Sequence, residues 1–281
     1  MTRGAGVSFG ISSFSIVVPA FNEAGRIPQS LRAIGEYAAR IPSTEFELIV
    51  VDDGSTDETA SVAERHLPNT RNVRSRVLRY PANRGKGYAV RYGLLAAGAP
   101  FALFTDADLS TPIDEIPRIL DALVSGVADV TFGSRALDRR LIGVHQPRRR
   151  EWAGRAFNVV LRLATGLPFL DTQCGFKAFR MSVCRPLLEA GTIDGFGFDI
   201  ELLYEAHRAG LRMREIPVRW NHHDGSKVRC LRDGVRMLRD IATVRRRGAA
   251  GVYDAGIHLA EAAAHRDRAH GTASVARTVT A

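Results

Sequence analysis

Short apolar, β-branched segments alternate with segments of helical length along the first half of the chain. Strands are predicted at residues 15–18, 46–51, 76–80, 101–105 and 129–132, and helices at about 27–40, 57–66, 87–98 and 113–124. This alternation predicts an α/β fold, in which a mostly parallel sheet carries helices on both faces. In such sheets ligands bind beyond the carboxyl ends of the strands, so polar residues at those ends are the first candidates for a site.

The second half of the chain is less regular. Helices are predicted at about 151–165 and 199–209, separated by a loop, and a strand is predicted around 213–220. One domain is expected over residues 14–247, after a flexible arm at 1–13. Residues 248–281 are rich in Ala, Gly, His and Thr, and they are predicted to form a poorly ordered tail with room for one short helix.

The net charge of +9 is concentrated in the second half of the chain. Residues 1–140 hold 16 basic and 16 acidic side chains, so residues 141–281 carry the whole excess. This asymmetry favours an anionic partner, which could be nucleic acid, anionic lipid or a phosphorylated substrate. Aromatic residues make up only 7% of the chain and no stacking motif stands out, so we expect no nucleic-acid partner. A basic nucleic-acid-binding protein is the alternative from a different functional class.

The sequence also indicates a compartment. It has no uninterrupted apolar run of about eighteen residues, the minimum for a membrane span, and no signal-peptide pattern at its N-terminus. Its three cysteines lack CxxC spacing, which argues against a disulfide framework or a zinc site and favours a reducing environment. We therefore expect a cytoplasmic protein.

Two carboxylates, Asp106 and Asp108, directly follow the predicted strand at 101–105. With one small residue between them, both can reach a single hard divalent cation. A leaving diphosphate requires such a cation, because Mg²⁺ or Mn²⁺ neutralises the charge that its departure builds up. The alternative is a solvated turn with capping aspartates, but the position after a buried strand favours metal binding.

The other strand ends carry candidate ligands for a nucleoside. Asp52 and Asp53 follow a buried strand, and a carboxylate there can accept hydrogen bonds from a nucleobase or a ribose. A helix cap is the alternative, but we favour ligand contact for one of these two acids. At Pro19, Phe21 and Glu23, the ring could line a base and the carboxylate could hold a ribose, although a simple turn explains that stretch equally well.

Lys86 lies between two glycines where a predicted helix begins, in the stretch Asn83-Arg84-Gly85-Lys86-Gly87. Backbone amides and a cation at a helix N-terminus suit a phosphate group. The stretch is not a Walker P-loop, because the upstream glycine and the Ser or Thr after the lysine are missing.

Together these motifs resemble the family-two glycosyltransferases of the GT-A fold. The matching signatures are Pro-x-x-Asn-Glu, Val-Asp-Asp-Gly-Ser, Asn-x-Gly-Lys-Gly and Asp-x-Asp, in the expected order. The chain looks most similar to the dolichyl-phosphate β-glucosyltransferase and polyprenyl-phosphate glycosyltransferase branch. The stretches that carry this closer resemblance are residues 105–112, 171–177 and 198–204. The resemblance covers residues 14–247 and implies that this domain has an extension on the acceptor side.

The resemblance implies a role for each matching residue. Pro19, Phe21 and Glu23 would surround the nucleoside, Asp52 would meet the base, and Lys86 would lie near the base or the phosphates. Asp106 and Asp108 would bind the metal and the diphosphate, while Gln173 and Lys177 would border the sugar and the acceptor. Asp199 falls where many relatives place a catalytic base, and it is also suited to cap the following helix.

Two basic segments remain to be explained. Arg149 belongs to a run of three arginines that enters a predicted helix, where arginines are electrostatically unfavourable, so we expect it to meet an anionic group such as an acceptor phosphate. Around residues 231–247, apolar residues line one helical face and arginines lie away from it. This predicts a basic, amphipathic C-terminal helix, which either lies on an anionic membrane surface or packs on the domain with a solvated basic face.

The expected reaction is inverting transfer of a hexose, preferably glucose from UDP-glucose, to a polyprenyl phosphate of the dolichyl type. The cofactor would be Mg²⁺ or Mn²⁺, and the enzyme would lie peripherally on the cytoplasmic face of a membrane. Two alternatives keep the same chemistry at the donor: GDP-mannose as the donor, or a hydroxyl on a soluble glycan or small molecule as the acceptor. A hydroxyl acceptor would require Asp199 as a true base, whereas a phosphate is already ionised.

Overall fold

The computed structural model describes residues 10–144, 148–222 and 230–278. Its centre is a seven-stranded sheet in the order β3-β2-β1-β4-β7-β5-β8. The strands are β1 (Ser13–Ala20), β2 (Glu45–Asp52), β3 (Val73–Arg79), β4 (Phe101–Thr105), β5 (Val130–Ser134), β7 (Phe176–Arg180) and β8 (Met213–Pro217). A small second sheet pairs β6 (Ile142–Val144) with β9 (Trp220–Asn221). Among the described strands of the main sheet, only β7 runs antiparallel to its neighbours.

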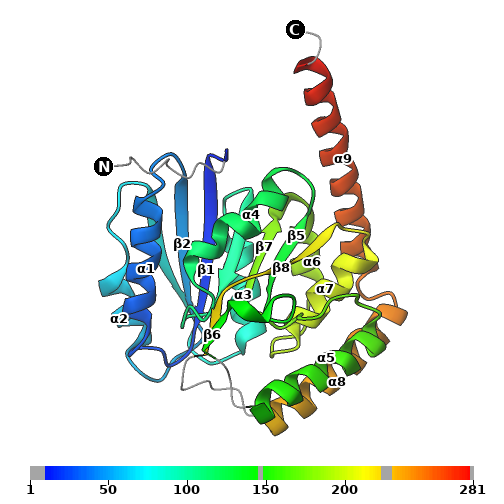
Figure 1. Cartoon of the computed structure of the whole chain (residues 1–281), viewed down its shortest axis with the longest axis horizontal. Helices are drawn as coiled ribbons and strands as arrows, with labels where there is room; N and C mark the ends of the chain where they lie inside the picture. Colours follow the sequence, from blue (N-terminus) through cyan, green and yellow to red (C-terminus); the bar gives the residue numbers. More distant parts are fainter. Residues whose placement is uncertain (1–9, 145–147, 223–229, 279–281) are drawn as a thin grey trace.

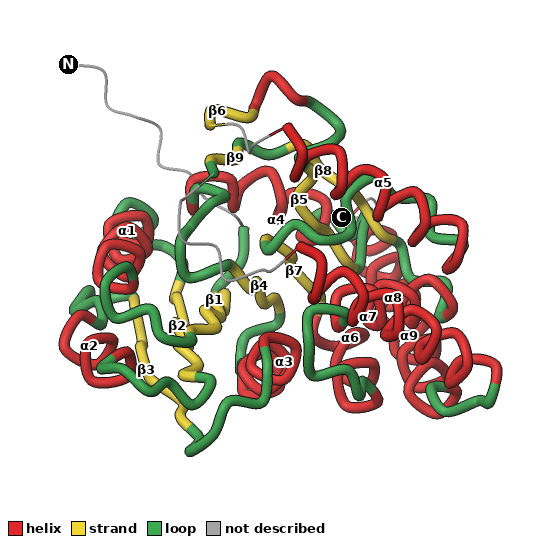
Figure 2. The backbone as a smooth tube through the Cα atoms, turned by 90° about the horizontal axis from the view of Figure 1, so that it is seen from below, coloured by secondary structure: helices red, strands yellow, loops and turns green. Residues whose placement is uncertain are grey.

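Helices cover both faces of the sheet (Figures 1 and 2). They are α1 (Ile27–Ala39), α2 (Thr59–His66), α3 (Lys86–Ala96), α4 (Ile116–Val124), α5 (Arg148–Thr165), α6 (Met181–Ala190), α7 (Phe198–Arg208), α8 (Cys230–Ala249) and α9 (Asp254–Thr278). Two short 3-10 helices, η1 (Ile113–Glu115) and η2 (Arg139–Leu141), lie in the connections. This is the α/β architecture that the alternation in the sequence predicts.

Each face of the sheet has its own apolar core. Along β1, Ile16 and Val18 pack with α1 and α4, whereas Val17 between them packs with α3, because successive side chains of a strand point to opposite faces. On α1, Ile27, Leu31 and Ile34 share one face and are fully buried. Burying side chains of this size stabilises the fold by about 1.5–3 kcal/mol each.

The register brings the predicted site residues to one edge of the sheet. In the parallel pairs, Ala20 at the end of β1 lies opposite Asp52, and Asp52 lies opposite Arg79. β4 also runs parallel to β1 and ends at Thr105, directly before Asp106. The loops after β1, β2 and β4 therefore open on the same side, as the strand-end argument predicts.

The prediction of a loop between residues 165 and 199 is wrong. β7 lies there and is inserted between β4 and β5, and α6 follows it directly. The pattern hides β7 because Lys177, in the middle of the strand, interrupts an otherwise apolar run in which Phe176, Ala178 and Phe179 are fully buried. α6 is hidden in a similar way, because Pro186 lies inside it.

The C-terminal region differs from the poorly ordered tail that its composition predicts. α9 begins at Asp254 and packs against α6, and Figure 1 shows its C-terminal part extending away from the domain. Its buried face consists of Ile257 and small residues, namely Ala260, Ala263 and Ala264. Alanines at this spacing allow close helix packing, but they give a weak hydrophobic signal in the sequence. Most of the predicted flexible arm, residues 1–9, lies outside the described residues.

Candidate active site

The loops after β1 and β2 are tied to each other. Asn22 follows β1 with a positive φ of 52°, and its side-chain oxygen accepts a hydrogen bond from the backbone N–H of Thr56 at 2.8 Å. The backbone N–H of Asn22 donates to the Ser55 hydroxyl at 2.9 Å. Glu23 accepts two hydrogen bonds from Arg26, at 2.7 and 2.8 Å. Phe21 and Glu23 thus lie on a fixed loop beside the end of β2, where the sequence predicts a nucleoside site.

The two acids after β2 differ in what they do. Asp53 accepts hydrogen bonds from the Tyr80 hydroxyl at 2.8 Å, from the Asn83 amide at 2.9 Å and from the backbone N–H groups of Arg84 and Gly85. It therefore organises the loop that leads into α3. Asp52 accepts a bond from Ser55 N–H at 3.1 Å, and Arg79 lies 3.7 Å away. Of the two, Asp52 has the fewer hydrogen bonds within the chain and is the better placed to accept one from a ligand.

Lys86, the first residue of α3, reaches across to the loop after β4. Its ammonium lies 2.6 Å from Oδ1 of Asp106, and both side chains are partly exposed. Burial acts to lower the pKa of Lys86, but the surrounding carboxylates, Asp106 foremost, raise it above its ordinary value. Gly85 allows this approach because it has a φ of 107°, and a Cβ there would lie 2.5 Å from the carbonyl oxygen of Asp194.

The loop that carries Asp106 and Asp108 is firmly held. Oδ1 of Asp108 accepts a hydrogen bond from Ser110 N–H at 2.9 Å, and the backbone of Leu109 has a positive φ of 46°. The carbonyl of Ala107 accepts a bond from the Ser30 hydroxyl. A Cβ added to Gly175 would collide with the Asp106 carboxylate, so the two chain segments meet at van der Waals contact.

This loop suits a hard divalent cation. Carboxylate oxygens are ligands that Mg²⁺ and Mn²⁺ prefer, and Asp106 and Asp108 lie in one short loop directly after β4. No group of three or more His, Cys, Asp or Glu suited to a metal occurs among the described residues. Asp106 and Asp108 would supply two carboxylates to such a cation, with a diphosphate and water at its other positions.

Lys177 and Asp199 form a second ion pair behind the first. The Lys177 side chain is fully buried, and its ammonium lies 2.7 Å from Oδ1 of Asp199 and donates to the carbonyl of Cys174 at 2.6 Å. Burial raises the pKa of Asp199, and the ammonium groups of Lys177 and Lys86 oppose this rise. Lys177 and Asp199 thus form a buried ion pair, and neither side chain is open to solvent.

The loop after β5 contains a charged residue that was not singled out from the sequence. Arg135 follows β5 and holds Asp171 in a bidentate pair at 2.7 and 2.8 Å. Burial acts to raise the pKa of Asp171, but the guanidinium of Arg135 lowers it overall. The Arg135 guanidinium also lies 5.6 Å from the centre of the Trp220 ring. Arg135 directly follows the observed end of β5, but the strand predicted from the sequence ended at residue 132, so its position after a strand was not recognised.

Gln173 lies in the same loop as Asp171, where its backbone N–H donates to Oδ1 of Asp171 at 3.2 Å. Its side-chain nitrogen is buried and has no hydrogen-bond partner among the described residues. Arg149 belongs to α5, but its side chain lies outside the described residues, so its predicted role stays a prediction.

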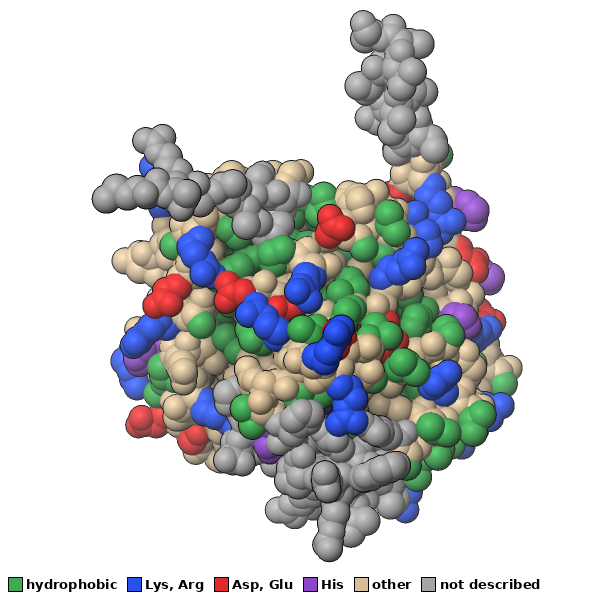
Figure 3. All heavy atoms as spheres, viewed as in Figure 1, with side chains coloured by type: hydrophobic (Ala, Val, Ile, Leu, Met, Phe, Trp, Pro, Cys, Tyr) green, Lys and Arg blue, Asp and Glu red, His purple; other side chains and the backbone are tan. Residues whose placement is uncertain are grey.

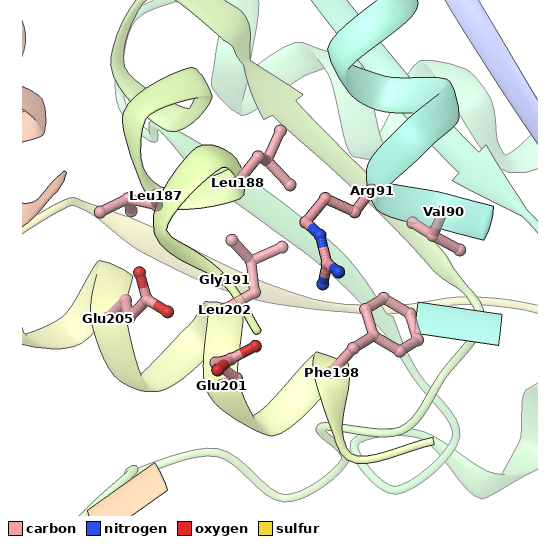
Figure 4. Close-up of a pocket in the computed structure, with 9 residues that line it drawn as sticks. All are labelled: Val90, Arg91, Leu187, Leu188, Gly191, Phe198, Glu201, Leu202 and Glu205. Carbon is pink, nitrogen blue, oxygen red and sulfur yellow. The ribbon is translucent and has the colours of Figure 1, made fainter. Parts of the chain in front are cut away.

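A small cavity lies between α3, α6 and α7, and none of the predicted site residues lines it (Figure 4). Its volume of about 20 Å³ is enough for one water molecule. Arg91, Glu201 and Glu205 are among its lining residues. Glu205 is fully buried, neither carboxylate oxygen has a hydrogen-bond partner among the described residues, and burial raises its pKa to about 9.

Several of the exposed apolar residues lie on α5 and α8. α5 and α8 lie side by side, and Figure 3 shows hydrophobic side chains at the surface where these helices lie in Figure 1. On α5, Val159, Val160 and Leu163 are 53%, 46% and 83% exposed. On α8, Ile241 and Val244 pack into the core, while Leu238 is exposed. None of the described helices is both long and apolar enough to cross a membrane.

Comparison with known proteins places this site in a family. The dolichyl-phosphate beta-glucosyltransferase of Drosophila melanogaster is 35% identical over 237 residues, which are 81% of this chain and 72% of that protein. The enzyme of the same name from Dictyostelium discoideum is 29% identical over 248 residues, covering 85% of this chain and 76% of that protein. Both alignments cover far more than half of the chain.

The fold is also found among solved structures. Glucosyl-3-phosphoglycerate synthase from Mycobacterium tuberculosis, solved with Mn²⁺, uridine diphosphate and glucosyl-3-phosphoglycerate, superposes with a TM-score of 0.62 at 22% identity. The superposition covers 87% of this chain and 85% of that one, which shows that the two share the GT-A-like fold. Residues 15–188, which contain the tied loops, Lys86 and the Asp106–Asp108 pair, match the model of one sequence family. The chain belongs to glycosyl transferase family 2.

Proposed function

We propose that this protein transfers glucose from UDP-glucose to a polyprenyl phosphate of the dolichyl type. The observation that carries the proposal is the grouping of Lys86, Asp106 and Asp108 at one sheet edge, beside the tied loops that carry Phe21 and Glu23. This arrangement suits a nucleoside diphosphate whose charge must be neutralised. The names of its relatives from Drosophila and Dictyostelium support glucose and a dolichyl phosphate as the transferred group and the acceptor.

The donor side of the site would work by fixed electrostatics. Asp52 and Glu23 would hold the base and ribose, with Pro19 and Phe21 packed around them. Asp106 and Asp108 would hold Mg²⁺ or Mn²⁺, which supplies neutralising charge to the departing diphosphate. Lys86 would donate to the same phosphates from the start of α3, where the helix dipole also favours negative charge.

On the acceptor side, a phosphate needs orientation rather than activation. Its oxygen is already ionised at neutral pH, so a single displacement at the anomeric carbon, with inversion, needs no strong base. The burial of Asp199 and its pairing with Lys177 suit such a role, because the carboxylate is held inside and acts on the site through its charge. Gln173 lies on the loop that would border the sugar, and Arg149 would meet the acceptor phosphate.

Contact with a membrane would bring the lipid to the enzyme. The exposed side chains of Val159, Val160 and Leu163 on α5 could enter the interface of the bilayer, and arginines on the adjacent α8 could meet anionic lipid. This assigns the apolar contact to α5, since Ile241 and Val244 of α8 face the protein core. We propose peripheral attachment at the cytoplasmic face.

The test supplies radiolabelled UDP-glucose or GDP-mannose to the purified protein together with membranes, followed by extraction of lipid. Label from UDP-glucose is expected in a mild-acid-labile lipid product. Label from GDP-mannose alone would replace glucose by mannose in the proposal. Label that stays in the water-soluble products would favour a hydroxyl acceptor instead.

A further inference from the structure

Two ion pairs in the site differ in how they are held. Lys86 pairs with Asp106, and Lys177 pairs with Asp199. The Lys177–Asp199 pair is buried and fixed, because Lys177 also donates to the carbonyl of Cys174. The Lys86–Asp106 pair differs, since both side chains are partly open to solvent.

Lys86 and a bound metal ion would therefore compete for the Asp106 carboxylate. Its ammonium lies 2.6 Å from an oxygen of Asp106, a carboxylate that would also be a ligand of the metal. An ammonium group and a divalent cation on the same carboxylate oxygen would repel each other at such short separation, so the lysine and the metal compete for it. If Lys86 leaves Asp106, this carboxylate becomes free to bind the cation together with Asp108.

We infer that Lys86 occupies the cation position at Asp106 while no donor is bound. When the donor binds, its diphosphate would provide new partners for Lys86, and the lysine would release the Asp106 carboxylate to the metal. The inference rests on the proposed function, because the diphosphate and the metal are those of the sugar donor. It assigns Lys86 a second role besides phosphate binding: the lysine competes with the metal until the nucleotide arrives. Metal and nucleotide would consequently bind together, each strengthening the binding of the other.

If Lys86 competes with the metal, its removal should strengthen metal binding, whereas removal of a metal ligand should weaken it. Binding of Mn²⁺ alone can be followed through the electron paramagnetic resonance signal of the free ion. Without nucleotide, Lys86→Met should bind Mn²⁺ about fivefold more tightly than the wild type, because the competing ion pair is gone. With Mn²⁺ present, the same variant should bind UDP about tenfold more weakly, because a charged donor to the phosphates is lost.

Two variants serve as controls. Arg84→Met removes a positive charge two residues away, from a guanidinium that lies over the Tyr88 ring and near Asp194, so its Mn²⁺ affinity should stay within about twofold of the wild type. Asp106→Asn should lose the binding, which identifies the measured site. Thermal melts of all three variants check that they are folded.

The failures can be told apart. If Lys86→Met binds Mn²⁺ no more tightly than the wild type, while wild-type UDP binding depends on Mn²⁺, the competition is refuted and the proposed function stands. If Mn²⁺ binding survives in Asp106→Asn, the ion lies elsewhere and the inference falls. If the wild type binds no UDP with Mn²⁺ or Mg²⁺, the proposed function fails and the inference fails with it.

Discussion

Lys177 and Asp199 form an ion pair, 2.7 Å between Nζ and Oδ1, that is almost completely shut off from solvent. One residue comes from an antiparallel strand and the other from the first turn of α7, so the pair joins two parts of the chain that are distant in sequence. A buried charge without its partner is strongly unfavourable. The behaviour of Asp199 variants must therefore separate stability from catalysis.

Replacement of Asp199 by Asn distinguishes the two acceptors. With a polyprenyl phosphate, the loss of kcat should be about tenfold to a hundredfold, because the nucleophile is already ionised. With a hydroxyl acceptor, the loss should reach about a thousandfold, and the acidic limb of the pH–rate profile should disappear. UDP affinity should change little. A variant inactive on lipid phosphate, with its fold intact, would contradict the proposed mechanism.

The stability of each Asp199 variant must be measured as a control, because a loss of folding would also lower activity. Asp199→Asn should lower the free energy of unfolding by about 3–5 kcal/mol, because Lys177 is left buried and charged. The double variant Lys177→Met/Asp199→Leu should recover most of this loss, since no unpaired charge remains. Activity is therefore compared only below the melting temperature of each variant, as measured by circular dichroism.

Replacement of Asp108 by Asn tests the metal site. Removal of one of two carboxylate ligands should reduce kcat by at least about a hundredfold and should weaken UDP binding only when metal is present. Asp114→Asn is the matched control, because Asp114 lies a few residues further along and pairs with Arg40 at the surface. Full activity of Asp108→Asn, or full wild-type activity in excess EDTA, would exclude this metal assignment.

Site residues that directly follow a strand were easier to predict from the sequence than site residues placed by tertiary contacts. Asp106 and Asp108 were predictable because they directly follow an apolar strand. Arg135 was overlooked because the predicted strand before it ended at residue 132, whereas β5 extends to Ser134. Lys177 could be connected to the site only by resemblance, because its place inside β7 depends on an antiparallel strand that pairs with residues far away in sequence. Contacts of this kind are tertiary, and no local pattern specifies them.

α9 shows that a helix which depends on tertiary packing is also hard to predict from local sequence patterns. Its buried face is made mainly of alanines that pack on α6, and small residues carry little hydrophobic periodicity. α1 was predicted almost to the residue, since Ile27, Leu31 and Ile34 repeat at helical spacing. The large apolar side chains of α1 made that helix predictable. α9 was not recognised in the sequence, because small side chains that let it pack closely on α6 give little hydrophobic periodicity.

Binding to a membrane tests the assignment of α5. The wild type should co-sediment with liposomes that contain anionic lipid, and added salt should weaken the binding. Val159→Ser/Leu163→Ser should remove the apolar part, and Arg245→Ala/Arg246→Ala should weaken binding by about 1 kcal/mol for each arginine. Leu259→Ser is the control, because this leucine is 58% exposed on α9. Unchanged co-sedimentation of both the α5 and the α8 variants would refute the proposal that these helices contact the membrane.

Glu205 should make stability fall as the pH rises. Its pKa is about 9 in the folded protein, against an ordinary value of 4.5, so the unfolded chain releases this proton first. Between these two values the contribution of Glu205 should reduce stability by about 1.4 kcal/mol per pH unit. Glu205→Gln should flatten the decline, as measured by urea unfolding from pH 5 to 9. Glu64→Gln, at an exposed position on α2, should follow the wild type, and a wild-type slope in Glu205→Gln would contradict the assignment.

Direct comparison of a phosphate and a hydroxyl acceptor tests the central claim. The purified protein is given UDP-glucose, Mn²⁺ and either a polyprenyl phosphate or the polyprenol of the same chain length, in the same detergent. The expected result is a β-linked glucosyl phosphate lipid from the first acceptor and no product from the second, with UDP released in equal amount to the product. Transfer to the polyprenol, or no transfer to the phosphate while UDP-glucose binds, would contradict it.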